Sequence, residues 1–269
     1  MRIAIYKKTI APENEVYLNK LIKELVDNHV EVVENQLDGH VDMLLSIGGD
    51  GTLLDAVPLV GDSGIPILGI NMGRLGFISS VAKEEIHQAV HQILEGRYTT
   101  ESRTLLELVA PQGVFHDKVN YALNEINIIR NPEHSLLAIK VFVNDVFLNT
   151  YWGDGILMAT PTGSTAYSLS AGGPILTPDS HCFVITPIAA HNLTVRPIVI
   201  PDDSVVRIQV EGREKKFVFS MDSRVCALDT MVELVVRKAD FCIHTVRMEG
   251  ADFFSTIRNK LMWGKDNRN

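Results

Sequence analysis

A strand followed by a glycine-rich turn and a helix constrains this chain more than any other feature. The apolar run Val41–Leu45 indicates a buried strand, and Leu53–Val57 indicates the start of a helix. Between them lies the stretch Ser46-Ile47-Gly48-Gly49-Asp50-Gly51-Thr52. Glycines at such a turn let a bulky anion approach the main-chain N–H groups. The stretch therefore predicts a strand–turn–helix unit that binds an anion.

Asp50 is the unusual residue of this turn. A carboxylate repels phosphate unless it holds a metal, takes a proton from an attacking hydroxyl or binds a sugar hydroxyl. The turn therefore indicates phosphoryl-transfer chemistry. Taken alone, the stretch is equally compatible with an ordinary glycine-rich turn in which Asp50 is a helix N-cap.

The spacing of apolar residues predicts two domains. Strands alternate with helices over residues 1–98, which indicates an α/β domain with a parallel sheet. In this domain a short helix is expected from Thr52 onward, ending near Pro58. Residues 99–245 show short alternating runs with hairpin turns, which predict a β-rich domain.

Three details of the second half follow from the same pattern. We expect a hairpin at Glu211-Gly212 and two separate strands, Met231–Arg237 and Phe241–Val246. We also expect a C-terminal helix within residues 246–269, which returns to the first domain. The apolar stripe of this helix consists of Phe253, Phe254, Ile257 and Leu261. Such a stripe needs another apolar surface to cover it.

Composition excludes several classes of protein. The chain has 269 residues, 46% of them hydrophobic, which suffices for one large or two ordinary domains. The net charge of −8 argues against binding to nucleic acid or an anionic membrane. No run reaches the ~18 apolar residues of a membrane span. Three cysteines without a CxxC pair indicate free thiols in a reducing compartment, so we expect a soluble cytoplasmic protein.

Three further stretches carry polar groups suited to a ligand. Asn71–Phe77 follows a predicted strand, with Phe77 as a candidate base-stacking residue and Arg74 as a candidate phosphate contact. Asn124-Glu125 places an amide beside a carboxylate among apolar residues, which suits a ribose diol or an adenine edge, or else buried structural hydrogen bonding. The Thr- and Ser-rich turn Thr160–Ser168 predicts hydroxyls and free N–H groups that hold a nucleotide.

Together these stretches resemble the motifs of NAD kinases, in the order in which that family carries them. The matching segments are Gly48–Thr52, Asn124-Glu125, and Thr160–Ser168 with Gly172-Gly173-Pro174. The turn Gly48–Thr52 alone is shared with diacylglycerol kinases, sphingosine kinases and, in variant form, phosphofructokinases. The longer Thr160–Ser168 stretch is more specific. The resemblance covers nearly the whole chain, up to Leu261–Gly264.

The resemblance implies a two-domain architecture with NAD bound between an α/β domain and a β-rich domain. It also implies a homo-oligomer, usually a tetramer, in which a neighbouring subunit completes the site. The implied reaction phosphorylates the 2′-hydroxyl of the adenosine ribose of NAD and yields NADP. The donor would be ATP, another triphosphate or polyphosphate, together with a divalent cation such as Mg²⁺.

The same resemblance assigns roles to individual residues. It implies that Asp50 is the general base and that Asp222 is a polar residue near the site. It assigns no residue as a metal ligand. The implied nucleotide-binding positions are Gly51, Phe77, Asn124, Glu125, Asp154, Thr162, Thr165, Ala166, Tyr167, Ser170 and Ala189. Two departures remove positive charge near the expected phosphates, because Asp55 and Trp152 stand where many members carry a basic residue.

Two other functions remain open at this point. The first is a lipid or sugar kinase of the wider group that shares the Gly48–Thr52 turn, and the Thr162–Tyr167 turn argues against it. The second is an NAD(P) sensor without catalytic activity, and the presence of Asp50 argues against that. The sequence has no GxxxxGK[ST] motif and no GxGxxG after a strand, so neither a P-loop nor a Rossmann site is expected.

Overall fold

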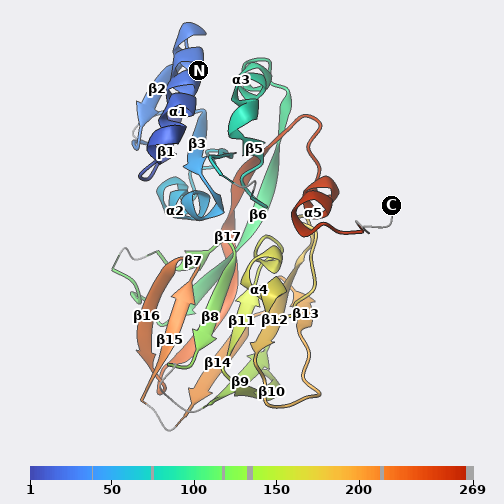
Figure 1. Ribbon diagram of the computed structural model, residues 1–269. Helices are drawn as coiled ribbons and strands as arrows, with labels where there is room; N and C mark the ends of the chain where they lie inside the picture. The colour runs from blue at the N-terminus through green and yellow to red at the C-terminus, as the bar shows by residue number, and fades with distance from the viewer. Residues whose placement is uncertain (38, 74–75, 117–118, 132–135, 213–214, 265–269) are drawn as a thin grey trace. The chain divides into compact units, whose positions relative to one another are not determined.

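The computed structural model describes residues 1–37, 39–73, 76–116, 119–131, 136–212 and 215–264 (Figure 1). The chain forms two compact units, Met1–Arg103 with Ile243–Asn269, and Thr104–Cys242. The first unit is α/β and the second is β-rich, which confirms the predicted fold class.

The first unit is built on a parallel sheet with the strand order β2-β1-β3-β4. These strands are β1 (Arg2–Lys7), β2 (Glu31–Glu34), β3 (Met43–Gly48) and β4 (Ile67–Asn71). The short strand β5 (Val81–Ala82) and the end of β17 (Glu233–Met248) both pair with β4. The helices of this unit are η1 (Pro12–Asn14), α1 (Glu15–Asp27), α2 (Asp50–Val60), η2 (Lys83–Glu85), α3 (Ile86–Leu94) and α5 (Phe253–Leu261).

The second unit contains two antiparallel sheets. One has the order β10-β9-β14 and continues into β17, and the other has the order β13-β12-β11-β8-β15-β16. The strands not yet given are β6 (Tyr98–Ala110), β7 (Tyr121–Ala122), β8 (Glu125–Ile129), β9 (Leu137–Val143), β10 (Val146–Gly153), β11 (Gly155–Ala159), β12 (Cys182–Ile188), β13 (Ile198–Pro201), β14 (Val206–Glu211), β15 (Lys216–Met221) and β16 (Arg224–Asp229). Two short helices, η3 (Gly163–Thr165) and α4 (Tyr167–Ser170), follow β11.

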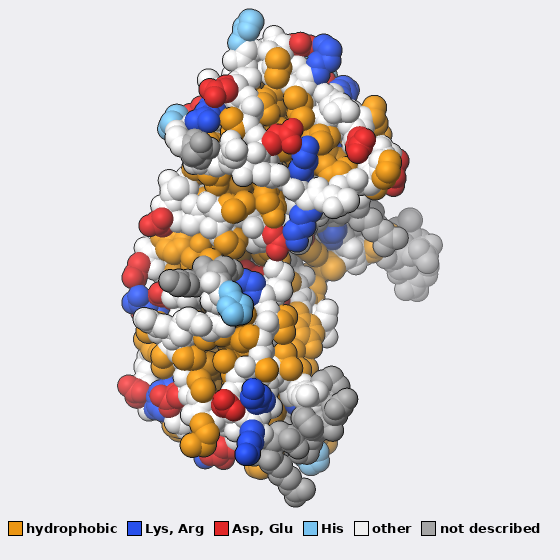
Figure 2. All heavy atoms as spheres, turned by 90° about the vertical axis from the view of Figure 1, so that its left-hand side faces the viewer, with side chains coloured by type: hydrophobic (Ala, Val, Ile, Leu, Met, Phe, Trp, Pro, Cys, Tyr) orange, Lys and Arg blue, Asp and Glu red, His pale blue; other side chains and the backbone are white. Residues whose placement is uncertain are grey.

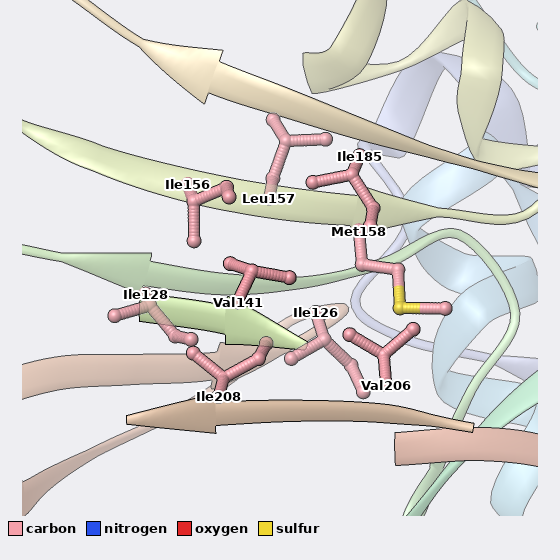
Figure 3. A pocket seen from close by; sticks show the side chains of 9 residues that line it. All are labelled: Ile126, Ile128, Val141, Ile156, Leu157, Met158, Ile185, Val206 and Ile208. Carbon is pink, nitrogen blue, oxygen red and sulfur yellow. The ribbon is translucent and has the colours of Figure 1, made fainter. Parts of the chain in front are cut away.

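The two sheets of the second unit share one apolar core. Figure 3 shows side chains of β8, β11 and β12 facing those of β9 and β14. They enclose a cavity of only ≈ 10 Å³, about the room of one water molecule. The core of this unit is therefore close-packed and offers no space for a small-molecule ligand.

Two long strands, β6 and β17, run through both units. The prediction of two strands between Met231 and Val246 is wrong, because β17 is continuous for 16 residues. The charged residues between the two predicted strands form ion pairs and do not interrupt β17: Lys238 binds Asp202, and Asp240 binds Arg237.

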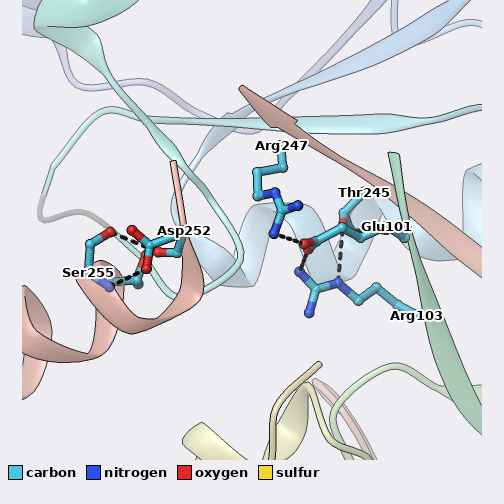
Figure 4. Close-up of polar contacts among 7 residues, drawn as sticks. Glu101, Arg103, Thr245, Arg247, Asp252 and Ser255 are labelled. Atoms are coloured by element: carbon cyan, nitrogen blue, oxygen red, sulfur yellow. Dashed lines mark hydrogen bonds and ion pairs between the residues drawn. The ribbon is translucent and has the colours of Figure 1, made fainter. Parts of the chain in front are cut away.

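A charged network ties the first-unit parts of these two strands together. Glu101 of β6 accepts from Arg103 at 2.5 Å and from Arg247 of β17 at 2.6 Å (Figure 4). The buried Arg103 also donates to the hydroxyl of Thr245 at 2.9 Å. A buried guanidinium is tolerated where its donors are paired, so this network keeps β6 and β17 in register.

Two local predictions are corrected. Helix α2 starts at Asp50, earlier than the expected Thr52, while its end at Val60 lies near Pro58 as expected. The predicted hairpin at Glu211-Gly212 is wrong. Strand β14 pairs with β9 and β17, whereas β15 pairs with β8 and β16, so this connection passes from one sheet to the other.

Helix α5 belongs to the first unit, and Asp252 is its N-cap. The carboxylate of Asp252 accepts from the backbone N–H of Ser255 at 2.8 Å (Figure 4). Of the expected apolar stripe, Ile257 is buried, but Phe254 remains 61% exposed. The stripe is therefore covered only in part within this unit.

The surface combines several kinds of side chain. On the face drawn in Figure 2, acidic and basic side chains are interspersed with exposed hydrophobic ones. Within the described ranges, no helix combines the length and the apolar character needed to span a membrane.

Replacing Phe219 by alanine tests the shared core of the second unit. Phe219 is fully buried and stacks on Phe115, with ring centroids 6.0 Å apart. We expect Phe219→Ala to lower the free energy of unfolding by about 3–5 kcal/mol. The matched control Phe254→Ala removes an exposed ring and should cost less than about 0.5 kcal/mol. Urea unfolding followed by circular dichroism measures both, and equal losses would contradict the core assignment.

Candidate active site

The glycine-rich turn lies at the carboxyl end of the parallel sheet. Strand β3 ends at Gly48, which pairs with Asn71 at the end of β4. Gly49 is the N-cap of α2, with extended backbone angles, and Asp50 is the first helical residue. The first N–H groups of a helix have no partner within it and favour anions, so α2 presents an anion-binding end here.

The Asp50 carboxylate connects this turn to the loop after β4. Its oxygens accept the backbone N–H groups of Phe77 at 2.8 Å, Ile78 at 3.3 Å and Ser79 at 2.9 Å. Asp50 is therefore not an N-cap, and its side chain caps no helix. A carboxylate offers about four lone-pair positions, so three N–H bonds leave room for one more donor.

Gly76 is what allows the Asp50 carboxylate to lie there. A Cβ on Gly76 would be 1.7 Å from Oδ1 of Asp50, far inside van der Waals contact. The next residue, Phe77, is half-buried, and Nζ of Lys260 on α5 lies 5.4 Å from its ring centroid. Gly51 is exposed, with open space around it. Arg74 lies outside the described residues.

In the second unit, Asn124 and Glu125 lie at the start of β8 and are only 7% and 8% exposed. The end of β11 holds them from one side. Thr160 donates its hydroxyl to the carbonyl oxygen of Leu123 at 2.6 Å and its N–H to that of Asn124 at 2.9 Å. A Cβ on Gly163 would be 2.0 Å from the same Asn124 oxygen. The structure therefore brings Asn124-Glu125 and the Thr160–Thr165 turn together.

Most hydroxyls of this turn form hydrogen bonds within the fold, a structural role that the sequence did not indicate. Ser164 donates to the carbonyl oxygen of Pro161 at 2.7 Å and accepts from the N–H of Leu176 at 3.0 Å. Ser168 bonds to Thr186 at 3.0 Å. Both serines are fully buried.

The outer side of the turn is the part that a ligand can reach. Tyr167 is 38% exposed, and Ser170 is exposed as well. Thr165 and Ala166 are half-buried, whereas Thr162 is buried and accepts the Thr165 hydroxyl at its carbonyl oxygen. The predicted residues from 165 to 170 therefore offer a more accessible surface than those from 160 to 164.

The Asn124-Glu125 pair carries unsatisfied acceptors. Among the described residues, Oδ1 of Asn124 and Oε2 of Glu125 are buried without a hydrogen-bond partner. Burial raises the pKa of Glu125 to about 8, and repulsion from Asp222 makes a smaller contribution in the same direction. A hydrogen bond with Asn127 lowers this pKa in part. Near neutral pH Glu125 is therefore mostly a neutral acid that can donate one hydrogen bond.

Asp154 and Ala189 lie away from this group. Both flank the opposite end of β11, where the N–H of Asp154 bonds to the carbonyl oxygen of Ile188. Since β11 has five residues, the two ends are about 17 Å apart. The Asp154 carboxylate accepts from Nε of Arg130 at 2.5 Å, and Ala189 is exposed with φ of 45°.

The two departures from the family pattern have different surroundings. Asp55 on α2 forms an ion pair with Lys8, which follows β1. Lys8 also lines an open pocket of ≈ 330 Å³ together with Lys7, Glu15 and Asn19. Trp152 is 51% exposed on β10.

Sequence reasoning missed the supporting residues of this site. Gly76 lies close to the carboxylate of Asp50, and Gly163 lies close to the carbonyl oxygen of Asn124. No local sequence pattern indicates either contact. Asp222, expected only as a polar residue near the site, accepts three backbone N–H groups, those of Leu123, Asn124 and Glu125. The only local signal was an aspartate in a turn between two alternating strands.

Comparison with known proteins identifies related chains. Residues 5–98 match the model of the ATP-NAD kinase N-terminal domain, and residues 123–248 match that of the ATP-NAD kinase C-terminal domain. An NAD kinase of Flavobacterium johnsoniae is 46% identical over 95% of this chain and 87% of its own length. An NAD kinase of Bacteroides fragilis is 43% identical over 95% of this chain and 85% of its own length.

Two solved structures resemble the chain closely. Yeast NADH kinase complexed with NADH has a TM-score of 0.87 and 26% identity, over 98% of this chain and 88% of that one. An NAD kinase from Archaeoglobus fulgidus in complex with ATP has a TM-score of 0.81 and 25% identity, over 97% of this chain and 99% of that one.

Gly76→Ala tests the position of the Asp50 carboxylate. The added methyl group would occupy the place of Oδ1, so the carboxylate must turn away from Phe77–Ser79. We expect phosphoryl transfer to NAD to fall at least about 10-fold, with the overall fold kept, because misplaced reacting groups are costly. Steady-state kinetics with circular dichroism checks this. Gly73→Ala is the control in the same loop, because among the described residues its Cβ would meet only Oδ1 of Asn71, at 3.8 Å.

Glu125→Gln tests the neutral state of Glu125. In the folded protein its pKa is about 8, above the ordinary 4.5, so the folded state binds more protons between these values. The stability of the unchanged protein should therefore fall as pH rises from about 4.5 to about 8, and part of that fall should be missing in Glu125→Gln. The difference should reach a few kcal/mol at most. Melting temperatures across this range measure it, and parallel pH curves would refute the neutral state.

Proposed function

The chain belongs to the NAD kinase family, and we propose on this premise that Asp50 activates the 2′-hydroxyl of the adenosine ribose of NAD. As a member of that family, the protein is a phosphotransferase that phosphorylates NAD with ATP. In the proposed step the hydroxyl proton passes to Asp50 and its oxygen bonds to the γ-phosphorus of ATP. The bond from that phosphorus to the β-γ bridging oxygen breaks, and NADP and ADP result.

The observation that supports the role of Asp50 is its bonding to Phe77, Ile78 and Ser79. Three N–H donors from one loop fix the direction of the carboxylate and leave one acceptor position for a hydroxyl. Phosphoryl transfer depends mostly on positioning and charge stabilisation, so a carboxylate held in one direction suits this reaction.

We propose that the adenosine half of NAD binds at Asn124 and Glu125 and against Tyr167. The buried Oδ1 of Asn124 lacks a partner among the described residues, so it can accept a hydrogen bond from a ribose hydroxyl or an adenine amino group. Glu125, when neutral, can donate one. A donor and an acceptor side by side match the edge of a nucleobase or a diol. Phe77, Thr162, Thr165, Ala166 and Ser170 complete the proposed contacts.

The donor phosphates are proposed to meet the N-terminal end of α2, at Gly49–Gly51. The backbone N–H groups there and the helix dipole favour negative charge. We propose that the divalent cation enters as the Mg²⁺ complex of ATP, as part of the substrate. Magnesium is commonly bound through substrate phosphates and water and needs few ligands from the protein itself.

A homo-oligomer, predicted to be a tetramer, would give Asp154 and Ala189 a role in the NAD site. They lie about 17 Å along β11 from Asn124, so we propose that they serve the site of a neighbouring subunit. The cytoplasmic location stays a prediction from the sequence.

The activity is tested by incubating the purified protein with NAD and Mg-ATP and measuring NADP with an NADP-specific dehydrogenase. We expect NADP to form, and polyphosphate in a parallel reaction establishes the range of donors. NAD binding without NADP formation from any donor would favour the sensor. Phosphorylation of a lipid or sugar in place of NAD would favour the wider kinase group.

Asp50→Asn tests the proposed base. The amide keeps one acceptor oxygen for the loop but cannot take the hydroxyl proton, so we expect kcat to fall about 10²–10⁴-fold. The KM for NAD should stay within a few-fold. Steady-state kinetics with both substrates measures this, and a normal kcat with a raised KM would show that Asp50 only binds NAD.

A further inference from the structure

Asp222 makes four hydrogen bonds to one short stretch of the second unit. It lies between β15 and β16 with φ of 51°, in the left-handed region. Its Oδ2 accepts the N–H of Leu123 at 2.8 Å, and its Oδ1 accepts those of Asn124 at 2.8 Å and Glu125 at 3.2 Å. Its own N–H donates to the carbonyl oxygen of Glu125 at 3.0 Å.

This stretch is held from two sides. Strand β8 lies between β11 and β15 in its sheet. Thr160, at the end of β11, binds the carbonyl oxygens of Leu123 and Asn124, while Asp222, at the end of β15, binds their N–H groups. The backbone that carries the Asn124 and Glu125 side chains therefore depends on a side chain 97 to 99 residues away.

We propose that Asp222 is a positioning residue for the NAD site: its carboxylate fixes the Leu123–Glu125 backbone and so aims Asn124 and Glu125 at the adenosine half of NAD. The inference rests on the proposed function, in which Asn124 and Glu125 contact that half. Asp222 itself bonds the backbone and touches no reacting atom.

The charge of Asp222 has a second effect on the same site. Repulsion from Asp222 adds to burial in raising the pKa of Glu125. Burial also raises the pKa of Asp222, while the three backbone N–H groups and the charge of Arg224 lower it. The three N–H donors on Asp222 favour its ionised form, and it is this form that repels a charge on Glu125.

Asp222→Gly is the principal variant, because glycine accepts φ of 51° without strain while the carboxylate is lost. Asp222→Asn is the second. Its Oδ1 can still accept the N–H groups of Asn124 and Glu125, but its amide N–H faces the N–H of Leu123. Asp202→Asn is the control. Asp202 is also a buried aspartate of this unit, 7% exposed and paired with Lys238 at 2.7 Å, and it follows β13 at the far side of the sheet.

NAD affinity is measured by calorimetry, with kinetics for both substrates and melting temperatures for all variants. We expect Asp222→Gly to weaken NAD binding about 10-fold or more and to leave the KM for ATP within about two-fold. Asp202→Asn should lower the melting temperature without weakening NAD binding. If Asp222→Gly is unfolded at the assay temperature, the NAD affinity of Asp222→Asn tests the inference instead.

For Asp222→Asn we expect weaker NAD binding and a shift of its pH dependence. Without the repulsion, Glu125 ionises at a lower pH, so the midpoint of NAD affinity against pH should move down. A purely structural role would not move that midpoint. If Asp222→Asn binds NAD with the same affinity and the same pH midpoint as the protein without substitutions, the inference about Asp222 is wrong. The proposed function would still stand in that case, because the protein without substitutions would still form NADP. Failure of that protein to form NADP would instead overturn the proposed function.

Discussion

A single carboxylate that accepts three successive backbone N–H groups is the interaction on which the candidate site residues of each unit depend. Asp50 does this for Phe77–Ser79 in the first unit, and Asp222 does it for Leu123–Glu125 in the second. Phe77–Ser79 lies in the loop between β4 and β5, and Leu123–Glu125 joins β7 to the first residue of β8. Hydrogen bonds to a charged acceptor contribute about 1.5–3 kcal/mol each, so one aspartate can hold a loop in one conformation. In this way the two segments that carry candidate site residues are hydrogen-bonded to a side chain far along the sequence.

Much of the fold could be predicted from local patterns. Apolar spacing indicated the strands and helices of the α/β unit. In the second unit, whose alternating runs indicated hairpins, the positive-φ pair Asn144-Asp145 closes a hairpin between β9 and β10. The errors arose where the local sequence pattern predicted one structure but contacts with residues far along the chain produced another. The charged residues Lys238 and Asp240 separated two predicted strands, but Asp202 pairs with Lys238 and Arg237 pairs with Asp240 within the continuous β17. The Glu211-Gly212 turn carried a hairpin signal, yet the strands on its two sides pair in different sheets.

The candidate site likewise has parts that could be predicted from the sequence and parts that could not. Its motifs were recognisable because residue types at fixed spacing carry them, as in the turn around Asp50. Its supports were not recognisable, because they join residues far apart in sequence: Gly76 leaves room for a side chain of α2, and Asp222 holds the start of β8. The same holds for the Thr- and Ser-rich turn. The sequence did not indicate that hydroxyls such as that of Ser164 satisfy the backbone of the turn that presents the accessible residues.

The division of the chain also bears on the order in which it folds during synthesis. The second unit is one continuous segment, Thr104–Cys242, whereas the first consists of Met1–Arg103 and Ile243–Asn269. Domains fold as units while the ribosome delivers the chain from its N-terminus. The residues made first must therefore wait for Ile243–Met248, which add the end of β17 beside β4, before their sheet is complete. The β-rich unit has all its strands before Ile243 is made, so until then that side of β4 is paired only by the short strand β5 among the described residues.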